Sequence, residues 1–378
     1  MMKMKKTNKR VEEFRGQVVM HPTFINVTKQ LVGAVYSSKE QPIVALMGPP
    51  GVGKTSIVLG ALLEVTEAEM PQMKIDKEYI PIVGARVPAP ETRAFPWKDC
   101  YFTMIEALFD PAVRAGVHFR EYNTKAQQRS LGFEFPTEKY LGRGTKQTLY
   151  RHFLRILEHR KPKAIILDEA HHFVFGVRNV ADRMQVLANR LKSMADEMGG
   201  TKLVLVGTYD MHSCLEATSQ GTRRLKIIEF PRYQYPDLHD ASDPFIITLC
   251  TFDDMLCDDL EFSPLDYAEE IYRGCLGCVG MLKSWFERSL ELAGDGKITL
   301  EVFRDSKMKD RHLNKAMDEI LRGEAYMASL ELSDQTLWQK FAPKAEVFTA
   351  QSKARAKSNR RPFQAKPRAF RKGFAHAK

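Results

Sequence analysis

The chain has 378 residues, of which 44% are hydrophobic and 28% charged, as is typical of a globular protein with two or three domains. No apolar run approaches the length of a bilayer span, and no secretory signal opens the sequence, so we expect no membrane contact. The six cysteines are scattered, and Cys275 and Cys278 form a lone C-x-x-C pair. This usage predicts reduced, buried thiols and a cytoplasmic location.

The net charge of +10 is placed unevenly along the chain. Residues 351–378 carry ten lysines and arginines and no acidic residue, and residues 1–10 carry five more cations. The residues between these two ends sum to a net negative charge. This asymmetry predicts a mildly acidic folded body with basic ends that bind polyanions.

Short, wholly apolar segments alternate with helical patterns through the first two thirds of the chain. Residues 11–41 are expected to be mostly helical. The expected strands are Ile43–Met47, Tyr79–Val83, Ala164–Leu167, Leu203–Val206 and Ile227–Phe230. The expected helices follow the loop after the first strand and follow Pro96-Trp97, fill Thr145–His159, and run from Val180 to Met198. Apolar strands between helices predict an α/β fold with a parallel sheet flanked by helices.

The remainder of the chain differs in composition. Gln234–Pro244 resembles a linker, residues 245–328 have helical patterns, and aliphatic residues become rare from about residue 346. The predicted domains are a basic N-terminal arm and helix start (1–28), an α/β domain (29–235), a small helical domain (236–328), a C-terminal helical extension (329–350) and a disordered basic tail (351–378).

A glycine-rich loop directly follows the first expected strand. It comprises Gly48, Pro49, Pro50, Gly51, Val52, Gly53, Lys54 and Thr55, and Ser56 continues into the next helix. This is the P-loop pattern, in which backbone N–H groups and a helix N-terminus converge on the phosphates of a nucleotide. We therefore predict that Lys54 binds the β- and γ-phosphates of ATP and that the Thr55 hydroxyl binds Mg²⁺.

Two acidic residues end the strand Ala164–Leu167. In P-loop folds the strand beside the phosphate loop supplies an aspartate to magnesium, and Asp168 occupies that position. Glu169 is then placed to polarise the attacking water. Thr208, which follows the strand Leu203–Val206, is predicted to contact the γ-phosphate or that water.

Cations near the end of the α/β domain and in the helical domain are further candidates. Arg223 and Arg224 precede the last expected strand, where an arginine reaches the nucleotide of a neighbouring subunit and neutralises charge in phosphoryl transfer. Lys283, in a helix opened by Gly277-Cys278-Val279-Gly280, is placed to contact the nucleotide from the small domain.

In this order, the motifs resemble those of the AAA+ ATPases and, more narrowly, of the TnsC/TniB family of transposition regulators. The similarity covers roughly residues 20–325. Its narrower part rests on the His171-His172 pair after the acids, the strand exit Phe230-Pro231-Arg232-Tyr233, and Gly277-Cys278-Val279-Gly280.

The resemblance implies an ATP-dependent prokaryotic protein that forms a ring or helical filament on duplex DNA. It would connect a target selector, often of the TniQ type, to the transposase, with ATP hydrolysis controlling disassembly. The DNA-facing elements of such proteins correspond here to Lys98 and to Arg143, Thr145 and Lys146. A capped helix N-terminus beside cations is a phosphate site, so these contacts would not select a DNA sequence.

The chain departs from this family at one position. Related small domains often carry an arginine where Met281 stands, and Lys283 is the nearest cation. The arginine that acts across subunits then becomes the more important cation for the bound nucleotide. Arg223 aligns better with that role, and Arg224 is the second choice.

Several alternatives stay open from the sequence. A replication initiator or clamp-loader-like AAA+ protein would share the fold and the ATP chemistry, and a scaffold NTPase would bind ATP without hydrolysing it. The basic tail at 351–378, with Phe363, Phe370 and Phe374 among its cations, is compatible with DNA contact, with docking on a protein such as the transposase, or with a solubilising role.

Overall fold

The structure is a computed structural model that describes residues 2–37, 41–91, 95–109, 144–174, 181–212, 225–238 and 240–330. The chain divides into a compact unit, Met1–Gly323, and a second unit, Glu324–Lys378. Among the described residues, no helix is both long and apolar enough to cross a membrane.

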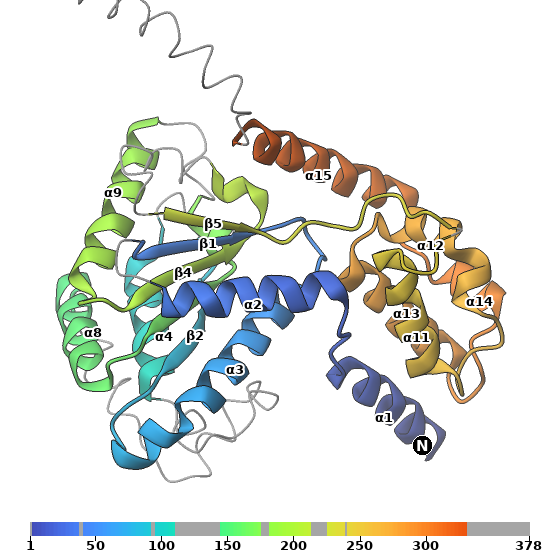
Figure 1. Cartoon of the computed structure of the whole chain (residues 1–378), viewed down its shortest axis with the longest axis horizontal. Helices are drawn as coiled ribbons and strands as arrows, with labels where there is room; N and C mark the ends of the chain where they lie inside the picture. The colour runs from blue at the N-terminus through green and yellow to red at the C-terminus, as the bar shows by residue number, and fades with distance from the viewer. Residues whose placement is uncertain are drawn as a thin grey trace, which may run out of the picture. The chain divides into compact units, whose positions relative to one another are not determined.

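The first unit contains one parallel sheet of five strands in the order β2-β3-β4-β1-β5. The strands are β1 (Ile43–Met47), β2 (Ile82–Arg86), β3 (Ala164–Asp168), β4 (Lys202–Gly207) and β5 (Leu225–Glu229). The expected parallel sheet is therefore confirmed, and β1 lies between β4 and β5 (Figure 1). All four strand pairings are parallel, so the carboxyl ends of the strands lie at one edge of the sheet. The loops after β1, β3 and β4 meet at this edge.

One predicted strand is displaced. We expected a strand at Tyr79–Val83, whereas β2 covers Ile82–Arg86. Pro81 has no N–H for the ladder, and the N–H of Ile80 bonds instead to the carbonyl of Arg160. The strand therefore begins after the proline, and its last residue, Arg86, pairs in register with Asp168.

Helices cover the sheet on both faces. Those around the sheet are α2 (Pro22–Tyr36), α3 (Lys54–Ile75), α4 (Trp97–Phe109), α8 (Lys146–Arg160) and α9 (Ala181–Glu197). Alternate strand residues such as Val44, Ile166 and Val204 pack in one core with apolar side chains of α2 and α3. In turn, α4 packs against β2 and α8.

The small domain is helical, as predicted, and is called the lid below. Its helices are α11 (Pro244–Leu256), α12 (Ala268–Cys275), α13 (Val279–Ala293), α14 (Leu300–Asp305) and α15 (Asp310–Leu330). A short 3-10 turn lies at Pro264–Tyr267 in the lid, and two others, Ala170–Phe173 and Tyr209–Met211, follow β3 and β4. The side chains of Cys275 and Cys278 are buried in the lid, and burial raises the pKa of the Cys275 thiol.

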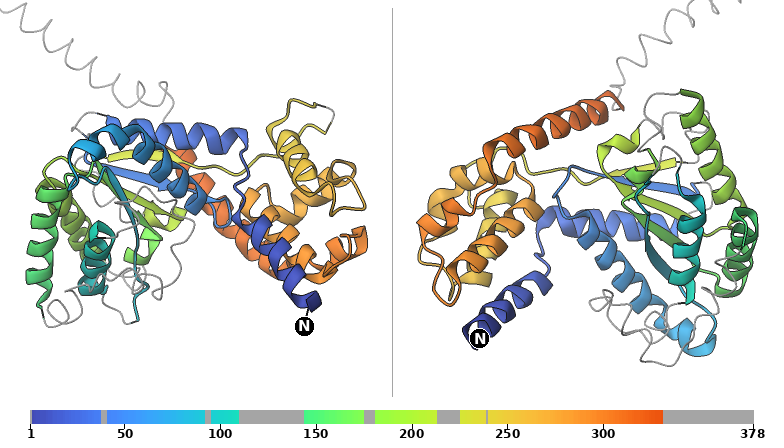
Figure 2. Two further views of the ribbon diagram at one scale, coloured as in Figure 1. Left: turned by 90° about the horizontal axis from the view of Figure 1, so that it is seen from below. Right: turned by 180° about the vertical axis from the view of Figure 1, so that it is seen from behind.

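The N-terminal helix α1 (Met2–Gly16) packs on the lid rather than on the sheet (Figure 2). Val11 and Phe14 belong to the lid core, and Arg10 pairs with Asp259. Arg15 lies 3.2 Å from Glu291 of α13. From the sequence we expect a basic N-terminal arm and helix start at residues 1–28, because periodicity within a helix does not reveal a partner about 270 residues away.

Candidate nucleotide site

The P-loop connects β1 to α3 at the carboxyl edge of the sheet. Gly51 and Gly53 have φ values of 72° and 108°, which glycine adopts without strain. Because the backbone turns there, the N-terminus of α3 faces the loop. Lys54 Nζ donates to the carbonyls of Gly48 at 3.0 Å and Pro49 at 2.8 Å, so the ammonium lies inside the loop.

Burial tunes the charge of Lys54. Desolvation lowers its pKa to about 8, although the nearby carboxylates of Asp168 and Glu169 act in the opposite direction. Hydrogen bonds from an ammonium to phosphate oxygens are stronger than those to neutral carbonyls. A bound phosphate would therefore replace the Gly48 and Pro49 carbonyls as the partners of Lys54. The role of Lys54 in binding phosphates stays a prediction.

Asp168 meets the P-loop directly. The Thr55 hydroxyl donates to Asp168 Oδ2 at 2.9 Å, across 113 positions of sequence. Burial raises the pKa of the Asp168 carboxyl, while hydrogen bonds from the Glu169 N–H and from Thr55 oppose that shift. The two side chains predicted to hold magnesium therefore lie side by side, and hydroxyl and carboxylate oxygens are ligands that Mg²⁺ prefers.

Glu169 has an unusual backbone, and an arginine and a histidine lie beside its carboxylate. Its φ is 57°, in the left-handed region that a glutamate adopts only at a cost of about 1–3 kcal/mol. Arg86 Nη2 lies 3.6 Å from Glu169 Oε1, and His171 Nδ1 lies 3.3 Å from Oε2. The turn after β3 thus directs the carboxylate of Glu169 toward β2 and away from the strand axis.

Sequence reasoning did not assign roles to Arg86, His171 or His172. Arg86 is the last residue of β2, and only the register of β2 and β3 places it opposite Asp168. His172 Nδ1 lies 2.9 Å from the carbonyl of Val87, whose N–H donates to the Asp168 carbonyl. The two histidines therefore fix the turn that carries the acids.

Thr208 lies directly after β4, as expected. Its hydroxyl is buried and has no hydrogen-bond partner among the described residues. Buried hydroxyls without a partner are uncommon in folded proteins, and ligand-binding positions are one place where they occur. A Cβ on the preceding Gly207 would approach the backbone N of His171 to 2.9 Å, so glycine lets β4 lie close to the acidic turn.

The lid touches the P-loop through backbone atoms. The Met281 N–H donates to the Gly51 carbonyl at 2.9 Å, and a Cβ on Gly280 would collide with that same carbonyl. The N-terminal end of α13 therefore lies against the phosphate loop. Glycine at position 280 is required by this close approach.

Lys283 takes a different direction from the one predicted. Its Nζ donates to the carbonyls of Arg15 at 2.9 Å and Gln17 at 2.6 Å, and it lies 5.7 Å from the centre of the Phe14 ring. Lys283 lies two residues after Met281, about 200° around α13, and so on a different face from the one that meets Gly51. In this structure Lys283 joins α1 to α13, and its role as a nucleotide contact stays a prediction.

The predicted DNA-facing residues are partly described. Lys98, Thr145 and Lys146 are exposed at the starts of α4 and α8, and the Thr145 hydroxyl accepts from the Thr148 N–H at 3.2 Å as an N-cap. Arg143, Arg223 and Arg224 lie outside the described residues.

The helices α4 and α8 begin at the same end. Tyr101 and Tyr150, each in the second turn of its helix, have ring centres 5.1 Å apart. The two N-termini are therefore neighbours.

Comparison with known proteins agrees with this fold. Residues 37–215, a little under half of the chain, match the family model described as an AAA domain. With the parallel sheet and the P-loop, this match defines the α/β unit as a nucleotide-binding domain of the AAA+ fold class, as the sequence predicted. No curated protein matches the chain.

Among solved structures, similar chains include the Aeropyrum pernix ORC2 protein in its ADP form, at 14% identity and a TM-score of 0.46. This alignment covers 74% of the present chain and 66% of the archaeal one. A second is Drosophila ORC bound to poly(dA/dT) DNA and Cdc6, at 12% identity and a TM-score of 0.39, covering 78% of this chain and 41% of that chain. The present chain thus spans less than two thirds of either structure.

Proposed function

We propose that this protein is a magnesium-dependent ATPase that assembles on duplex DNA. The observation that carries the proposal is the 2.9 Å contact between Thr55 and Asp168, because it joins the P-loop to the acidic strand in a single site. Thr55 and Asp168 would hold Mg²⁺, which when bound supplies a positive charge that offsets the charge of the phosphates. Lys54 binds the phosphates from inside the loop.

Glu169 is the proposed general base for the attacking water. Arg86 and His171 position its carboxylate, and the unpartnered hydroxyl of Thr208 is available to the γ-phosphate or to the water. The remaining charge on the transferred phosphoryl group would be met by Arg223 of a neighbouring copy, with Arg224 as the second choice. The site is complete only when copies of the chain assemble, so we propose a homo-oligomer, either a ring or a filament.

DNA is the proposed template for this assembly. The neighbouring N-termini of α4 and α8, with the exposed Lys98 and Lys146 and the capping Thr145, provide N–H groups and cations for phosphates. Arg143 is proposed to extend this surface. Contacts of this kind position a duplex without selecting its sequence.

The resemblance to the TnsC/TniB family supports a more specific role. We propose that the protein is a cytoplasmic transposition regulator of a prokaryote. It would couple a TniQ-like target selector to transposase subunits, with ATP hydrolysis controlling its assembly and disassembly on DNA. Target choice would come from the selector, because the proposed DNA contacts do not distinguish sequences.

Electron microscopy of the protein with duplex DNA and a non-hydrolysable ATP analogue tests this proposal. Rings or filaments that enclose DNA and disperse with ATP are expected. The matched control omits the nucleotide and should give dispersed protein. Monomers that ignore DNA in all conditions would refute it, and DNA-bound assemblies that melt an origin-like duplex without responding to a transposase would favour an initiator-like protein instead.

A further inference from the structure

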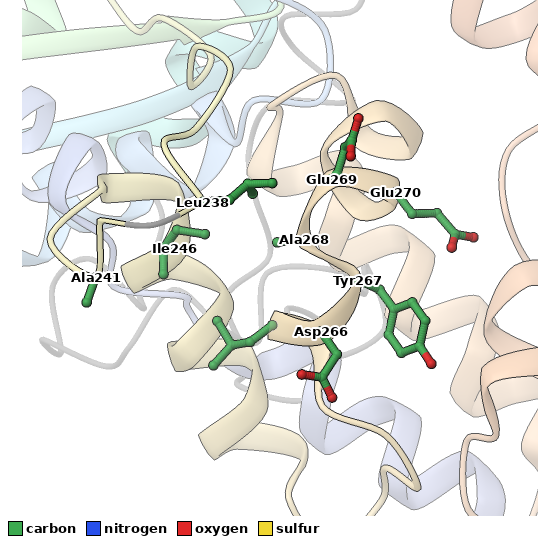
Figure 3. Close-up of a pocket in the computed structure, with 9 residues that line it drawn as sticks. Leu238, Ala241, Ile246, Asp266, Tyr267, Ala268, Glu269 and Glu270 are labelled. Atoms are coloured by element: carbon green, nitrogen blue, oxygen red, sulfur yellow. The ribbon is translucent and has the colours of Figure 1, made fainter.

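The lid has a pocket that the proposed ATPase site does not use. It has a volume of about 530 Å³ and lies between the linker that follows β5, helix α11 and the start of α12. Figure 3 shows apolar side chains, Leu238 and Ile246, on one side and the carboxylates of Asp266, Glu269 and Glu270 on the other. We call this the lid pocket.

The lid pocket lies in the most acidic part of the chain. Residues 233–272 contain eleven aspartates and glutamates and no lysine or arginine. Two of the pocket acids have arginine partners, since Glu269 pairs with Arg273 and Glu270 with Arg304. Asp266 is exposed, and no described arginine or lysine pairs with it. The pocket therefore presents unbalanced negative charge beside an apolar wall.

The apolar wall is exposed as well. Leu238 is 42% exposed and Leu265 is 38% exposed, next to the partly buried Ile246. A partner that suits this surface has large apolar side chains with cations close to them. A purely cationic ligand would leave the apolar wall in water, and a purely apolar one would leave the carboxylates without a partner.

The chain itself contains such a partner. Residues 351–378 carry ten cations and no acid, and each of Phe363, Phe370 and Phe374 lies within three residues of an arginine or lysine. This composition complements the lid pocket in both charge and apolarity. We propose that the basic tail, residues 351–378, of a second copy of this chain docks in the lid pocket, an inference that rests on the proposed assembly of several copies.

The consequence is a contact between copies that needs no nucleotide. Tail docking would hold lids and tails of neighbouring copies together before DNA arrives. Because duplex DNA is a denser polyanion than the pocket, DNA would compete for the same cations. The pocket would then bind the tail most strongly in DNA-free protein at low salt.

A peptide titration tests the pocket. The probe is a fluorescently labelled peptide of residues 351–378, and the receptor is the full chain with its ten tail cations changed to glutamine. We expect binding with a Kd on the order of 10 μM at low salt, weakening as salt rises. The double variant Leu238→Ser/Asp266→Asn in the same receptor should bind about tenfold more weakly.

Two matched controls separate the pocket from general charge attraction. Leu292→Ser/Asp254→Asn makes the same two changes at exposed lid positions that do not line the pocket, and it should leave the affinity unchanged. A peptide with Phe363, Phe370 and Phe374 changed to alanine keeps all ten cations and should bind more weakly. Equal affinity for pocket and control variants, or no binding to the protein at all, would overturn the proposal.

A mixing experiment tests whether the tail comes from a second copy. One full-length copy carries the neutral tail and an intact pocket, and the other carries the pocket variant and an intact tail. Neither copy can occupy its own pocket, so association should appear only in the mixture, measured by sedimentation without ATP or DNA. Peptide binding without association of the mixture would assign the pocket to the chain's own tail and overturn the inference. The pocket variant keeps its nucleotide site, so its ATP turnover and its assembly on DNA test the proposed function separately.

Discussion

In the α/β body, short apolar strands pack their alternate side chains under α2 and α3, whereas the lid core is built largely from aromatic rings on helices far apart in sequence. Trp285 stacks on Phe303 with ring centres 4.2 Å apart, and Phe252 stacks on Phe286 at 5.2 Å. Phe14 of α1 joins Phe252 at 6.4 Å. The body is therefore assembled from neighbouring β-α units, whereas the lid core includes α1, a helix from the N-terminal end of the chain.

The two regions also meet at a seam built differently from either core. The hydroxyl of Tyr233, just after β5, lies 2.8 Å from Nδ1 of His21. His21 is buried and precedes α2. His21 stacks on Phe230, and a Cβ on Gly48 of the P-loop would collide with the Phe230 carbonyl. The two connections that link lid and body are thus tied to each other beside the phosphate loop. The predicted nucleotide site thus lies in the body, and the body is coupled to the lid through a few buried contacts.

The largest expected effect tests the chemistry of the body. Glu169→Gln removes the proposed general base and should lower ATP turnover by about 10²–10⁴-fold while nucleotide binding persists, because Lys54 and the P-loop are unchanged. Steady-state turnover and nucleotide titration measure the two effects. Glu64→Gln, an exposed acid on α3, is the matched control. Turnover that survives Glu169→Gln would show that another group activates the water.

The next prediction tests whether α1 belongs to the lid. Phe14→Ala removes a buried ring, 4% exposed, and should destabilise the lid by about 3 kcal/mol. Thermal and denaturant unfolding measure the loss. Met20→Ala, which truncates a side chain that is 56% exposed, should change stability by less than about 0.5 kcal/mol. Equal effects of the two substitutions would separate α1 from the lid core.

The seam predicts a dependence of stability on pH. Burial lowers the pKa of His21 from 6.5 to about 4, so the unfolded chain binds a proton in this interval that the folded chain does not. The stability linked to His21 is complete above pH 6.5 and falls by about 3 kcal/mol as the pH drops to 4. Denaturant unfolding from pH 7 to 4 measures it. His21→Gln should flatten this part of the profile, and an unchanged profile would contradict the assignment.

The smallest expected effect concerns the position of Glu169. Arg86→Ala removes a side chain that is 75% exposed and lies 3.6 Å from the carboxylate, so kcat should fall by about tenfold or less with the nucleotide Kd unchanged. Arg86→Lys should restore part of the rate, since it retains a cation. A rise in Kd with constant kcat would instead place Arg86 among the nucleotide-binding groups.

Much of the candidate site was predictable because it is local in sequence. The P-loop pattern and the acids after an apolar strand specify backbone shape and chemistry within a few residues of each other. Arg86, His171 and His172 were not predictable, because their roles depend on the register of β2 against β3 and on the turn after β3. The partners of Lys283 were not predictable for the same reason, since only the packing of α1 on α13 supplies the carbonyls that it contacts.

The sequence by itself determined the α/β class, the nucleotide loop at Gly48–Thr55, and the magnesium and base candidates Asp168 and Glu169. These features follow from periodicity and from short motifs, whose physics acts over one strand and one turn. Only the tertiary structure decided that α1 completes the lid, that His21 and Tyr233 join the two connections, and that an acidic, partly apolar pocket lies on the lid surface. The first two features depend on contacts between residues more than 200 positions apart. The pocket depends on how the segments between Leu238 and Glu270 pack together, which local patterns do not specify.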